Sequence, residues 1–518
     1  MGISHSSVYL ASTAFALLGS GIVWQKVCSS PPEWIKELDM MGQPRKQKLF
    51  GTAVVCGGSI AGTVAARILA DHFERVILVD PELHDIEKPR TRIMQYNATH
   101  ALLSLFIDGA RRLWPNLTRN LRPRADVYAD LQLHYSGITV PAPYWDYPGG
   151  HLPDTLAMRR STTQPTLYKL LMQHPSANIT VWPGTVRGVT ASDNKTFIRS
   201  VLIRKLDGTE IAVNDVNLAV DCTGRMQAGM KWLETAGFSL PENLRVSYKP
   251  NIRYATLCFT VSPELESRLP IPEYALNSVC AYIHSQHFTH GLSVTALLKT
   301  DNNTMQVMLT SCEDNLPRSV PEILPFMATI RGHEPLAPWF VETVEMLCEH
   351  CDSPSFDIIK IPEQSYVKYN SVPAGDLPSN FIAVGDAHIQ LNPVHGQGVA
   401  KIMLNAITLN SLLHSIDSPA LPRDFSARYF KKNADRTEGL WDATRLHDYG
   451  SSDCEPMAGE TRDDGRFARW FELKLISAAM QHQEVASVLW RVRNMIAAER
   501  ALLAPTVLWK ALWTRSRF

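Results

Sequence analysis

A short glycine-rich stretch, CGGSIAG at residues 56–62, has the residue types that a dinucleotide-binding loop requires. Such a loop needs small residues because its turn is tight and the following helix must bring backbone N–H groups close to a pyrophosphate. Gly57 and Gly62 stand at the first and third glycine positions of the G-x-G-x-x-G pattern, Gly58 lies between them, and Ser59 replaces the second glycine. Serine is small and can donate to phosphate, so this replacement weakens the motif without excluding it.

An acidic residue follows at the expected place. Asp80 ends the apolar stretch RVILVD, roughly 20 residues beyond the loop, where it would accept hydrogen bonds from ribose hydroxyls and disfavour a 2′-phosphate. The loop and Asp80 alone leave a second interpretation open. Glycine-rich turns are common, and a structural turn that binds nothing would have the same residues.

A second stretch, GDAHIQLNPVHGQG at residues 385–398, is more specific. It joins an acid after a glycine to a proline-containing loop that ends just before a segment with helical spacing. The residues with candidate roles are Gly385, Asp386, Gly396, Gln397 and Gly398. A helix that begins at such a turn directs its partly positive N-terminus at whatever is bound there.

Together the two stretches resemble the FAD-dependent monooxygenases of the para-hydroxybenzoate hydroxylase type, the group A flavoprotein monooxygenases, in a squalene-epoxidase-like arrangement. The resemblance covers about residues 53–411, and a serine in the loop is a familiar variant in that superfamily. It implies that Asp386 binds the ribityl chain of FAD. It also implies that the helix after the GQG turn points at the flavin N1–C2=O region, where its N-terminus would stabilise a reduced, anionic flavin.

Three further stretches agree with this resemblance. PRTRIMQYNATHALL carries Arg90 and Gln95 in the Arg-x-x-x-x-Gln segment that follows the second strand. In MRRSTTQPTLYKLL the resemblance assigns Arg160, with Arg159 as the neighbouring alternative, to reach the FAD. VDCTGR, with Asp221, resembles the Asp-x-x-Gly-Arg turn that takes the place of the family's DG motif. Each has a simpler interpretation, because the arginines could be solvated surface charges and Asp221 could cap a turn.

No second glycine-rich loop is available for a nicotinamide, which resembles the class in which NAD(P)H docks transiently and reduces the flavin. The reduced flavin would then react with O₂, while the protein orients the substrate and excludes water. The sequence identifies no catalytic base, and His388 and Tyr254 are weak candidates. His388 and His395 are seven residues apart with a proline between them, so we expect no metal site.

The sequence therefore predicts an FAD-dependent monooxygenase that uses NAD(P)H and O₂ to hydroxylate or epoxidise an apolar small molecule in specialised metabolism. One alternative is an FAD-dependent reductase of isoprenoid double bonds. Halogenation is less favoured because a W-x-W-x-I-P segment is absent. A non-catalytic escort of prenylated proteins would keep the glycine loop but would not need the Asp386 region.

These motifs need a Rossmann-like α/β domain to position them. Strand-like AVVC, a helix-like segment and RVILVD form a βαβ start, and apolar residues at helical spacing run from Asn97 to Trp114. Residues 253–311 read instead as a mostly antiparallel sheet, and the end of the chain reads as helical. The predicted domains are an anchor and linker at 1–48, FAD-binding parts at 49–245 and 371–415, a substrate-binding sheet domain at 246–370 and a helical region at 416–518.

The N-terminal segment predicts a membrane anchor. Residues 8–24 carry no charge, and Lys26, Lys36 and Arg45 follow them, so the catalytic body should face the cytosol, with the endoplasmic reticulum as one fitting location. A cleaved signal or a buried helix would have a similar pattern. The chain has 51 basic and 51 acidic residues, so nucleic acid is not an expected partner.

Overall fold

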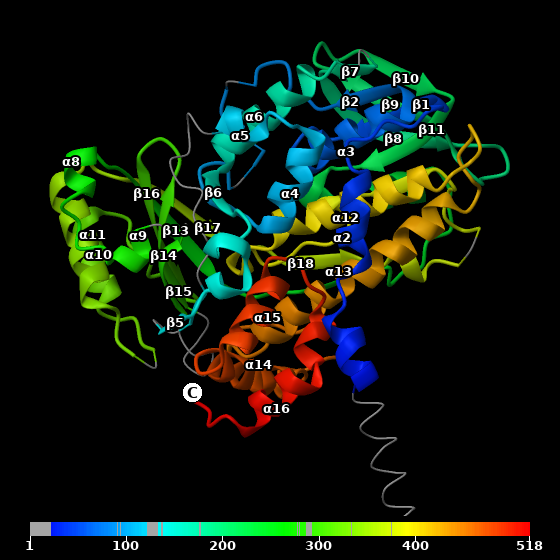
Figure 1. Cartoon of the computed structure of the whole chain (residues 1–518). Helices are drawn as coiled ribbons and strands as arrows, with labels where there is room; N and C mark the ends of the chain where they lie inside the picture. Colours follow the sequence, from blue (N-terminus) through cyan, green and yellow to red (C-terminus); the bar gives the residue numbers. More distant parts are fainter. Residues whose placement is uncertain are drawn as a thin grey trace, which may run out of the picture.

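The computed structural model describes residues 22–517 except positions 87, 91, 94, 122–132, 136–137, 176–177, 277, 279, 286–292, 333 and 374. Its two large sheets lie side by side, and the C-terminal helices lie below them in Figure 1. Most of the predicted anchor, residues 8–21, falls outside the described part. Among the helices that are described, none is both long enough and apolar enough to cross a membrane.

A parallel five-stranded sheet, in the order β19-β11-β1-β2-β7, forms the first half of the molecule. Its strands are β1 (Leu49–Cys56), β2 (Phe73–Val79), β7 (Ile179–Trp182), β11 (Val216–Asp221) and β19 (Phe381–Ala383). The runs AVVC, VILV and LAV are apolar without alternation because this sheet is covered on both faces. The predicted βαβ start is therefore present.

Helices and a small sheet cover the parallel sheet. Helix α3 (Ile60–His72) is buried along its whole length and packs on β1 and β2 and against α12 (Gly398–His414). An antiparallel sheet of β8 (Gly184–Ala191), β9 (Ile198–Lys205) and β10 (Glu210–Asn214) packs on β11 through β9. The hairpin predicted around the Asp-Gly turn is β9–β10.

The second large sheet is antiparallel, in the order β14-β15-β16-β13-β17. Its strands are β13 (Arg253–Thr260), β14 (Cys280–Ser285), β15 (Val294–Thr300), β16 (Thr304–Ser311) and β17 (Ser355–Lys360). It has its own apolar core beneath α8 (Pro263–Glu266), α9 (Glu273–Leu276), α10 (Val320–Met327) and α11 (Pro338–His350). The chain enters this sheet domain through β12 (Arg245–Tyr248) and leaves it through β18 (Gln364–Val367). These two strands pair as an antiparallel ladder.

The C-terminal region is helical, as predicted. It consists of α13 (Phe425–Asp448), α14 (Arg466–Ala479), α15 (Gln483–Arg493), the 3-10 helix η9 (Glu499–Leu503) and α16 (Pro505–Trp513). Helix α13 packs on α12, and the last helices share a separate apolar core. The predicted fold class, a Rossmann-like domain with an inserted antiparallel sheet domain and a helical C-terminal region, is confirmed.

Shorter elements connect these layers. They are α2 (Glu33–Glu37), η1 (Leu38–Met40), β3 (Thr99–Leu102), α4 (Ser104–Leu113), α5 (Leu117–Leu121), β4 (Leu133–Tyr135), β5 (Ile138–Val140), β6 (Leu156–Arg159), α6 (Arg160–Met172) and α7 (Ala228–Thr235). The helical pattern predicted from Asn97 was wrong at its start. Residues 99–102 pair with β6 as a strand, and the helix begins at Ser104.

Candidate functional site: a cradle of loops and helix N-termini

The glycine loop lies at the carboxyl end of β1, where α3 begins. Gly57 has a φ of 112°, a left-handed conformation that favours glycine. A Cβ on Gly62 would lie 1.7 Å from the carbonyl oxygen of Gly57, so the first turn of α3 can approach the loop only without a side chain. These two glycines are required by the backbone itself, with or without a ligand.

Asp80 closes the loop from the neighbouring strand. Its Oδ2 accepts a hydrogen bond from the Gly58 N–H at 2.8 Å, and its Oδ1 accepts one from the Glu82 N–H at 2.8 Å. Arg90 places Nη1 3.2 Å from the same Oδ1. Arg90 is buried, so it is not the solvated surface charge of the simpler interpretation.

Arg160 and Ser59 connect the first turns of two helices. The guanidinium of Arg160, the first residue of α6, donates from Nη2 to Ser59 Oγ at 2.5 Å and from Nε to Gln164 Oε1 at 3.2 Å. Burial lowers the pKa of Arg160 to about 10, so it remains cationic at neutral pH. A cation beside the free N–H groups of α3 makes a site for an anion, which is what a pyrophosphate would need.

Asp386 lies across from this cation in the short 3-10 helix η7 (Gly385–Ala387). Gly385 packs so closely on α3 that a Cβ there would lie 2.9 Å from the Cβ of Ala61. The side chain of Asp386 is 47% exposed, and its Oδ1 is 2.9 Å from Nζ of Lys401. Its negative charge also acts on Arg160. The GD motif and the glycine loop, more than 300 residues apart, thus share one cradle.

Lys401 is a site residue that sequence reasoning missed. It lies one turn into α12, is buried, and donates to both Asp386 and the carbonyl oxygen of Ile389. The available signal was a single lysine within the apolar run GVAKIMLNAI. A lysine is rarely buried unless it is paired, and this one fixes the orientation of the Asp386 carboxylate.

The GQG turn ends the 3-10 helix η8 (Pro393–His395) and starts α12. Gly396 has a φ of 67° and closes η8. Gln397 is the N-cap residue of α12, and Gly398 is its first residue. A Cβ on Gly398 would meet no heavy atom within 4 Å, and its φ is not left-handed. The protein itself therefore gives no reason for glycine at 398, whereas a flat ligand lying against the helix N-terminus would.

Asp221 is held entirely by its own turn. Its Oδ1 accepts from the backbone and side chain of Thr223 at 2.8 and 2.6 Å, and its Oδ2 accepts from the Gly229 N–H at 2.7 Å. Burial raises the pKa of this carboxyl group. The geometry gives Asp221 the turn-capping role, next to the Cys222 carbonyl that contacts Gly57. Its contact with a cofactor stays a prediction.

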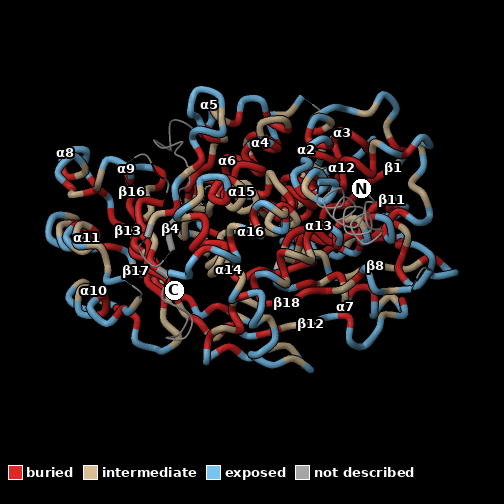
Figure 2. The backbone as a smooth tube through the Cα atoms, turned by 60° about the horizontal axis from the view of Figure 1, so that its bottom comes forward, coloured by how far each residue is buried: buried red, intermediate tan, exposed pale blue. Residues whose placement is uncertain are grey.

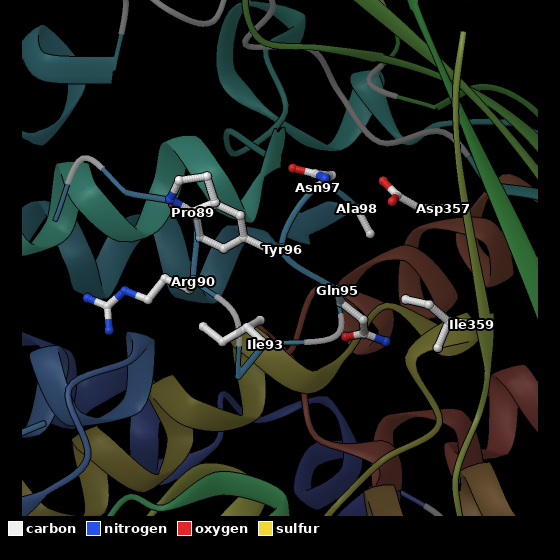
Figure 3. A pocket seen from close by; sticks show the side chains of 9 residues that line it. All are labelled: Pro89, Arg90, Ile93, Gln95, Tyr96, Asn97, Ala98, Asp357 and Ile359. Atoms are coloured by element: carbon white, nitrogen blue, oxygen red, sulfur yellow. The ribbon is translucent and has the colours of Figure 1, made fainter. Parts of the chain in front are cut away.

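A cavity of about 210 Å³ lies between the segment 89–98 and β17, where the two halves meet. Figure 3 shows Ile359 on β17 opposite Gln95, and Asp357 of the same strand opposite Ala98. Oδ2 of Asp357 is buried without a hydrogen-bond partner among the described atoms. Ligand pockets usually exceed roughly 300 Å³, so this cavity fits a small group or part of a larger molecule.

Comparisons with solved structures identify the fold. The flavin-dependent brominase Bmp2 is 12% identical, with 89% of this chain and 98% of that chain covered and a TM-score of 0.60. The p-nitrophenol 4-monooxygenase PnpA from Pseudomonas putida DLL-E4 is 14% identical, with 87% and 98% covered and a TM-score of 0.54. This chain has the flavoprotein monooxygenase fold. PqsL, a probable FAD-dependent monooxygenase from Pseudomonas aeruginosa, is 14% identical, with 78% and 97% covered and a TM-score of 0.52.

The flavoprotein monooxygenase fold is the part of the expected resemblance that is confirmed, whereas the squalene-epoxidase-like branch stays a prediction. No family model matches the sequence, and no curated protein matches it. The assignment of individual residues to FAD likewise stays a prediction, carried by the geometry described above.

Neither weak candidate for a catalytic base is suited to that role. His388 is fully buried against Tyr366, Tyr369 and Phe430, and Asn433 donates to it at 2.9 Å. Burial lowers its pKa to about 3, so it is a neutral core residue. Burial also raises the pKa of Tyr254 far above its usual range. Among the described residues, no group of His, Cys, Asp and Glu side chains could hold a metal ion.

A buried polar network lies next to the GQG turn and includes His395, the residue before it. His395 Nε2 lies 2.9 Å from Oδ1 of Asp448, whose Oδ2 accepts from Tyr248 and Asn392 at 2.8 Å each. The ring of His447 lies 5.1 Å from that of His395. The network holds His395, the residue before the turn, in a fixed orientation. Sequence reasoning missed it because its members come from three separate segments.

His447 extends this network to α14 and makes stability depend on pH. Burial alone would lower its pKa, but Glu472, 2.9 Å from its Nδ1, and Asp448 together outweigh burial and raise the pKa from 6.5 to about 9. A raised histidine pKa stabilises the folded state fully below the unfolded value, and this contribution disappears as pH rises through the folded value. The window is therefore pH 6.5 to about 9.

We expect the free energy of unfolding to fall across that window by on the order of 2 kcal/mol from this residue. Urea unfolding of the wild-type chain and of His447→Gln at several pH values measures the contribution. The variant should show a flatter decline, because glutamine does not titrate. His350→Gln, at an exposed histidine, is the matched control and should keep the wild-type slope. Equal slopes in wild type and His447→Gln would contradict the assignment.

Proposed function

We propose that this chain is an FAD-dependent monooxygenase that uses NAD(P)H and O₂ to oxidise an apolar small molecule. The observation that carries the proposal is the joint position of Ser59 and Arg160 at the N-termini of α3 and α6, with Asp386 of η7 across from them. A purely structural glycine turn would not need a buried cation beside it or a half-exposed carboxylate across from it.

The residues present fit FAD in one orientation. The N–H groups after Gly58 and the Arg160 guanidinium would hold the pyrophosphate, and Asp80 would accept from the adenosine ribose. Asp386, held by Lys401, would accept from the ribityl hydroxyls. The open space at Gly398 would take the flavin edge against the N-terminus of α12, where the helix dipole stabilises negative charge. Bound FAD would supply electron transfer from NAD(P)H to O₂, and the chain supplies position, charge and exclusion of water.

The substrate would lie between the cradle and the antiparallel sheet. Val394, two residues before the GQG turn, packs with Tyr254 and Ile359. Because Ile359 also lines the cavity at Asp357, that cavity adjoins the proposed flavin site. Hydroxylation or epoxidation in specialised metabolism fits a site of this kind.

Reduction of an isoprenoid double bond remains the second candidate, because the same cradle would serve a reductase. A Diels–Alderase, PyrE3, also has this fold with a TM-score of 0.51, so the fold does not determine the reaction.

We also propose that the N-terminal segment anchors the protein to a membrane with its body in the cytosol. The support is the uncharged run of residues 8–24 and the lysines and arginine that follow it. Such a location would suit a lipophilic substrate.

The test uses the full chain purified in detergent. We expect a bound-flavin absorption spectrum, its bleaching by NADPH or NADH under argon, and hydrogen peroxide release when air is admitted without substrate. Absence of flavin would overturn every enzymatic form of the proposal. Flavin that is reduced by the nicotinamide but does not consume O₂ would favour the reductase.

A variant pair links the test to the cradle. Asp386→Ala should lose FAD, because its carboxylate would be the acceptor for the ribityl chain, whereas Asp376→Ala, at an exposed aspartate ten residues earlier in the chain, should retain it. Equal FAD content in both variants would remove Asp386 from the site.

A further inference from the structure

The last helix presents aromatic side chains to solvent instead of burying them. Trp509 is 65% exposed, Trp513 is 72% exposed and Leu512 is 51% exposed. The opposite side of α16 is buried through Val507 and Ala511 in the core of the C-terminal helices. Spacing of three and four residues places the exposed side chains on one face, and the rings of Trp509 and Trp513 lie 5.1 Å apart.

The first described residues extend this face. Residues 22–29 are helical, and Ile22, Val23 and Trp24 are 70%, 63% and 46% exposed. Trp24 Nε1 donates to the Leu503 carbonyl oxygen at 3.1 Å, and Gln25 Oε1 accepts from the backbone and side chain of Thr506 at 3.2 Å each. We call the surface formed by Ile22, Val23, Trp24, Leu503, Trp509, Leu512 and Trp513 the tryptophan face.

Figure 1 shows α16 and the beginning of the described chain at the same end of the molecule, away from both large sheets. Figure 2 turns this end toward the viewer and shows α14, α15 and α16 near the middle of the view. The tryptophan face is thus formed by two ends of the chain, separated by more than 470 residues and joined by hydrogen bonds.

The two chain segments that form the tryptophan face carry only basic charged side chains. Residues 1–32 and 500–518 contain no acidic residue. They contain five basic residues, Lys26, Arg500, Lys510, Arg515 and Arg517. Lys510 pairs with Glu484 at 2.9 Å and Arg517 with Glu334 at 3.7 Å. The local excess of positive charge contrasts with the zero net charge of the whole chain.

We propose that the tryptophan face lies in the headgroup region of a lipid bilayer that contains anionic lipids. Tryptophan is enriched at this depth because its ring is apolar while its N–H can bond to water and headgroups. Helix α16 has nine residues, far too short to cross a bilayer, so it lies in the plane of the membrane. Basic residues beside an apolar face add attraction to anionic lipids.

The position of the chain's beginning argues for a membrane rather than a protein partner. The 21 residues before Ile22 include the uncharged run that starts at Val8, and that run ends within the tryptophan face at Trp24. An apolar segment that enters a bilayer would bring the tryptophan face to the same surface. This proposal is independent of the N-terminal anchor proposed above, because α16 should bind lipid even when the N-terminal segment cannot insert.

The experiment measures co-sedimentation with phosphatidylcholine vesicles containing a minority of phosphatidylserine. The starting protein is the full chain with Leu10→Asp and Leu17→Asp, which prevents insertion of the N-terminal segment while leaving the described residues intact. We expect it to bind these vesicles, and to bind pure phosphatidylcholine vesicles or high-salt samples less tightly. Adding Trp509→Ser and Trp513→Ser should weaken binding by about tenfold or more.

Trp145→Ser on the same background is the matched control, since Trp145 is 53% exposed and lies outside the tryptophan face. It should bind vesicles like its parent. Thermal unfolding of each variant checks that the exposed substitutions leave the fold intact. No vesicle binding by the starting protein, or equal binding with and without the two face tryptophans, would overturn the proposal. A dimer in lipid-free solution that dissociates on Trp509→Ser and Trp513→Ser would instead assign the tryptophan face to a second copy.

Discussion

Replacing Gly62 with alanine is expected to remove FAD from the protein and to lower the free energy of unfolding by about 2–4 kcal/mol. The new Cβ would lie 1.7 Å from the Gly57 oxygen and 2.8 Å from its carbonyl carbon. Both are backbone atoms, so no side-chain rotation relieves the overlap. Either α3 must move away from β1 or the loop must open, and both displace the N–H groups that would hold a pyrophosphate. Urea unfolding and the flavin content of the purified chain measure the two effects.

Gly188→Ala is the matched control for that substitution. Gly188 lies in β8, has no heavy atom within 4 Å of its would-be Cβ, and does not have a left-handed φ. Its replacement should change the free energy of unfolding by no more than about 0.5 kcal/mol and leave the flavin bound. If Gly62→Ala retains flavin as well as Gly188→Ala does, the loop is not the binding site.

The parts of the fold that could be predicted are those with local signals. The loop at Gly57 has its glycines, its strand and its helix within about 30 residues, and β9–β10 has an Asp-Gly turn between two strand-like runs. The antiparallel sheet was visible through β13, β15 and β16. Its edge strand β17 was not predicted, because it pairs with β13 across about 100 residues and nothing in SFDIIK specifies that partner.

The start of α4 shows how tertiary pairing overrides a local pattern. Residues 97–114 have helical spacing, yet Thr99–Leu102 pair with β6 and form a strand. Gln306 of β16 also holds this strand, since its Oε1 accepts from the Thr99 N–H at 2.9 Å. These contacts come from residues 54–60 and 207 positions away, which no periodicity in the segment could reveal.

In the candidate site, too, the residues with local signals were predicted and those that depend on distant partners were not. Asp80, Arg160 and Asp386 were predicted because each stands in a motif with a fixed spacing. Lys401 and the pair His395–Asp448 were not, because each acts through a partner in another segment. His388 lies inside the GD motif, yet its side chain points into an aromatic core. The motif predicted the position of the His388 backbone correctly, but the role of its side chain as a base was wrong.

Gly398→Leu is expected to separate flavin binding from folding. Leucine favours a helix over glycine by about 1 kcal/mol, and the position has no neighbouring heavy atom within 4 Å, so the free energy of unfolding of the apoprotein should stay the same or rise slightly. The isobutyl group would occupy the space against the N-terminus of α12 that the flavin edge would use. An overlap of this size costs about 1–3 kcal/mol, which corresponds to a roughly ten- to hundredfold weaker affinity for FAD.

Titration of the apoprotein with FAD, followed by flavin fluorescence, measures the affinity, and urea unfolding without FAD measures stability. Gly188→Leu controls for adding the same side chain at another open glycine and should bind FAD normally. The contrast with Gly62→Ala is informative, because that variant should lose stability and flavin together, whereas Gly398→Leu should lose flavin alone. Wild-type FAD affinity in Gly398→Leu would mean that the helix N-terminus does not face the cofactor, and the proposed orientation of the flavin would have to be abandoned.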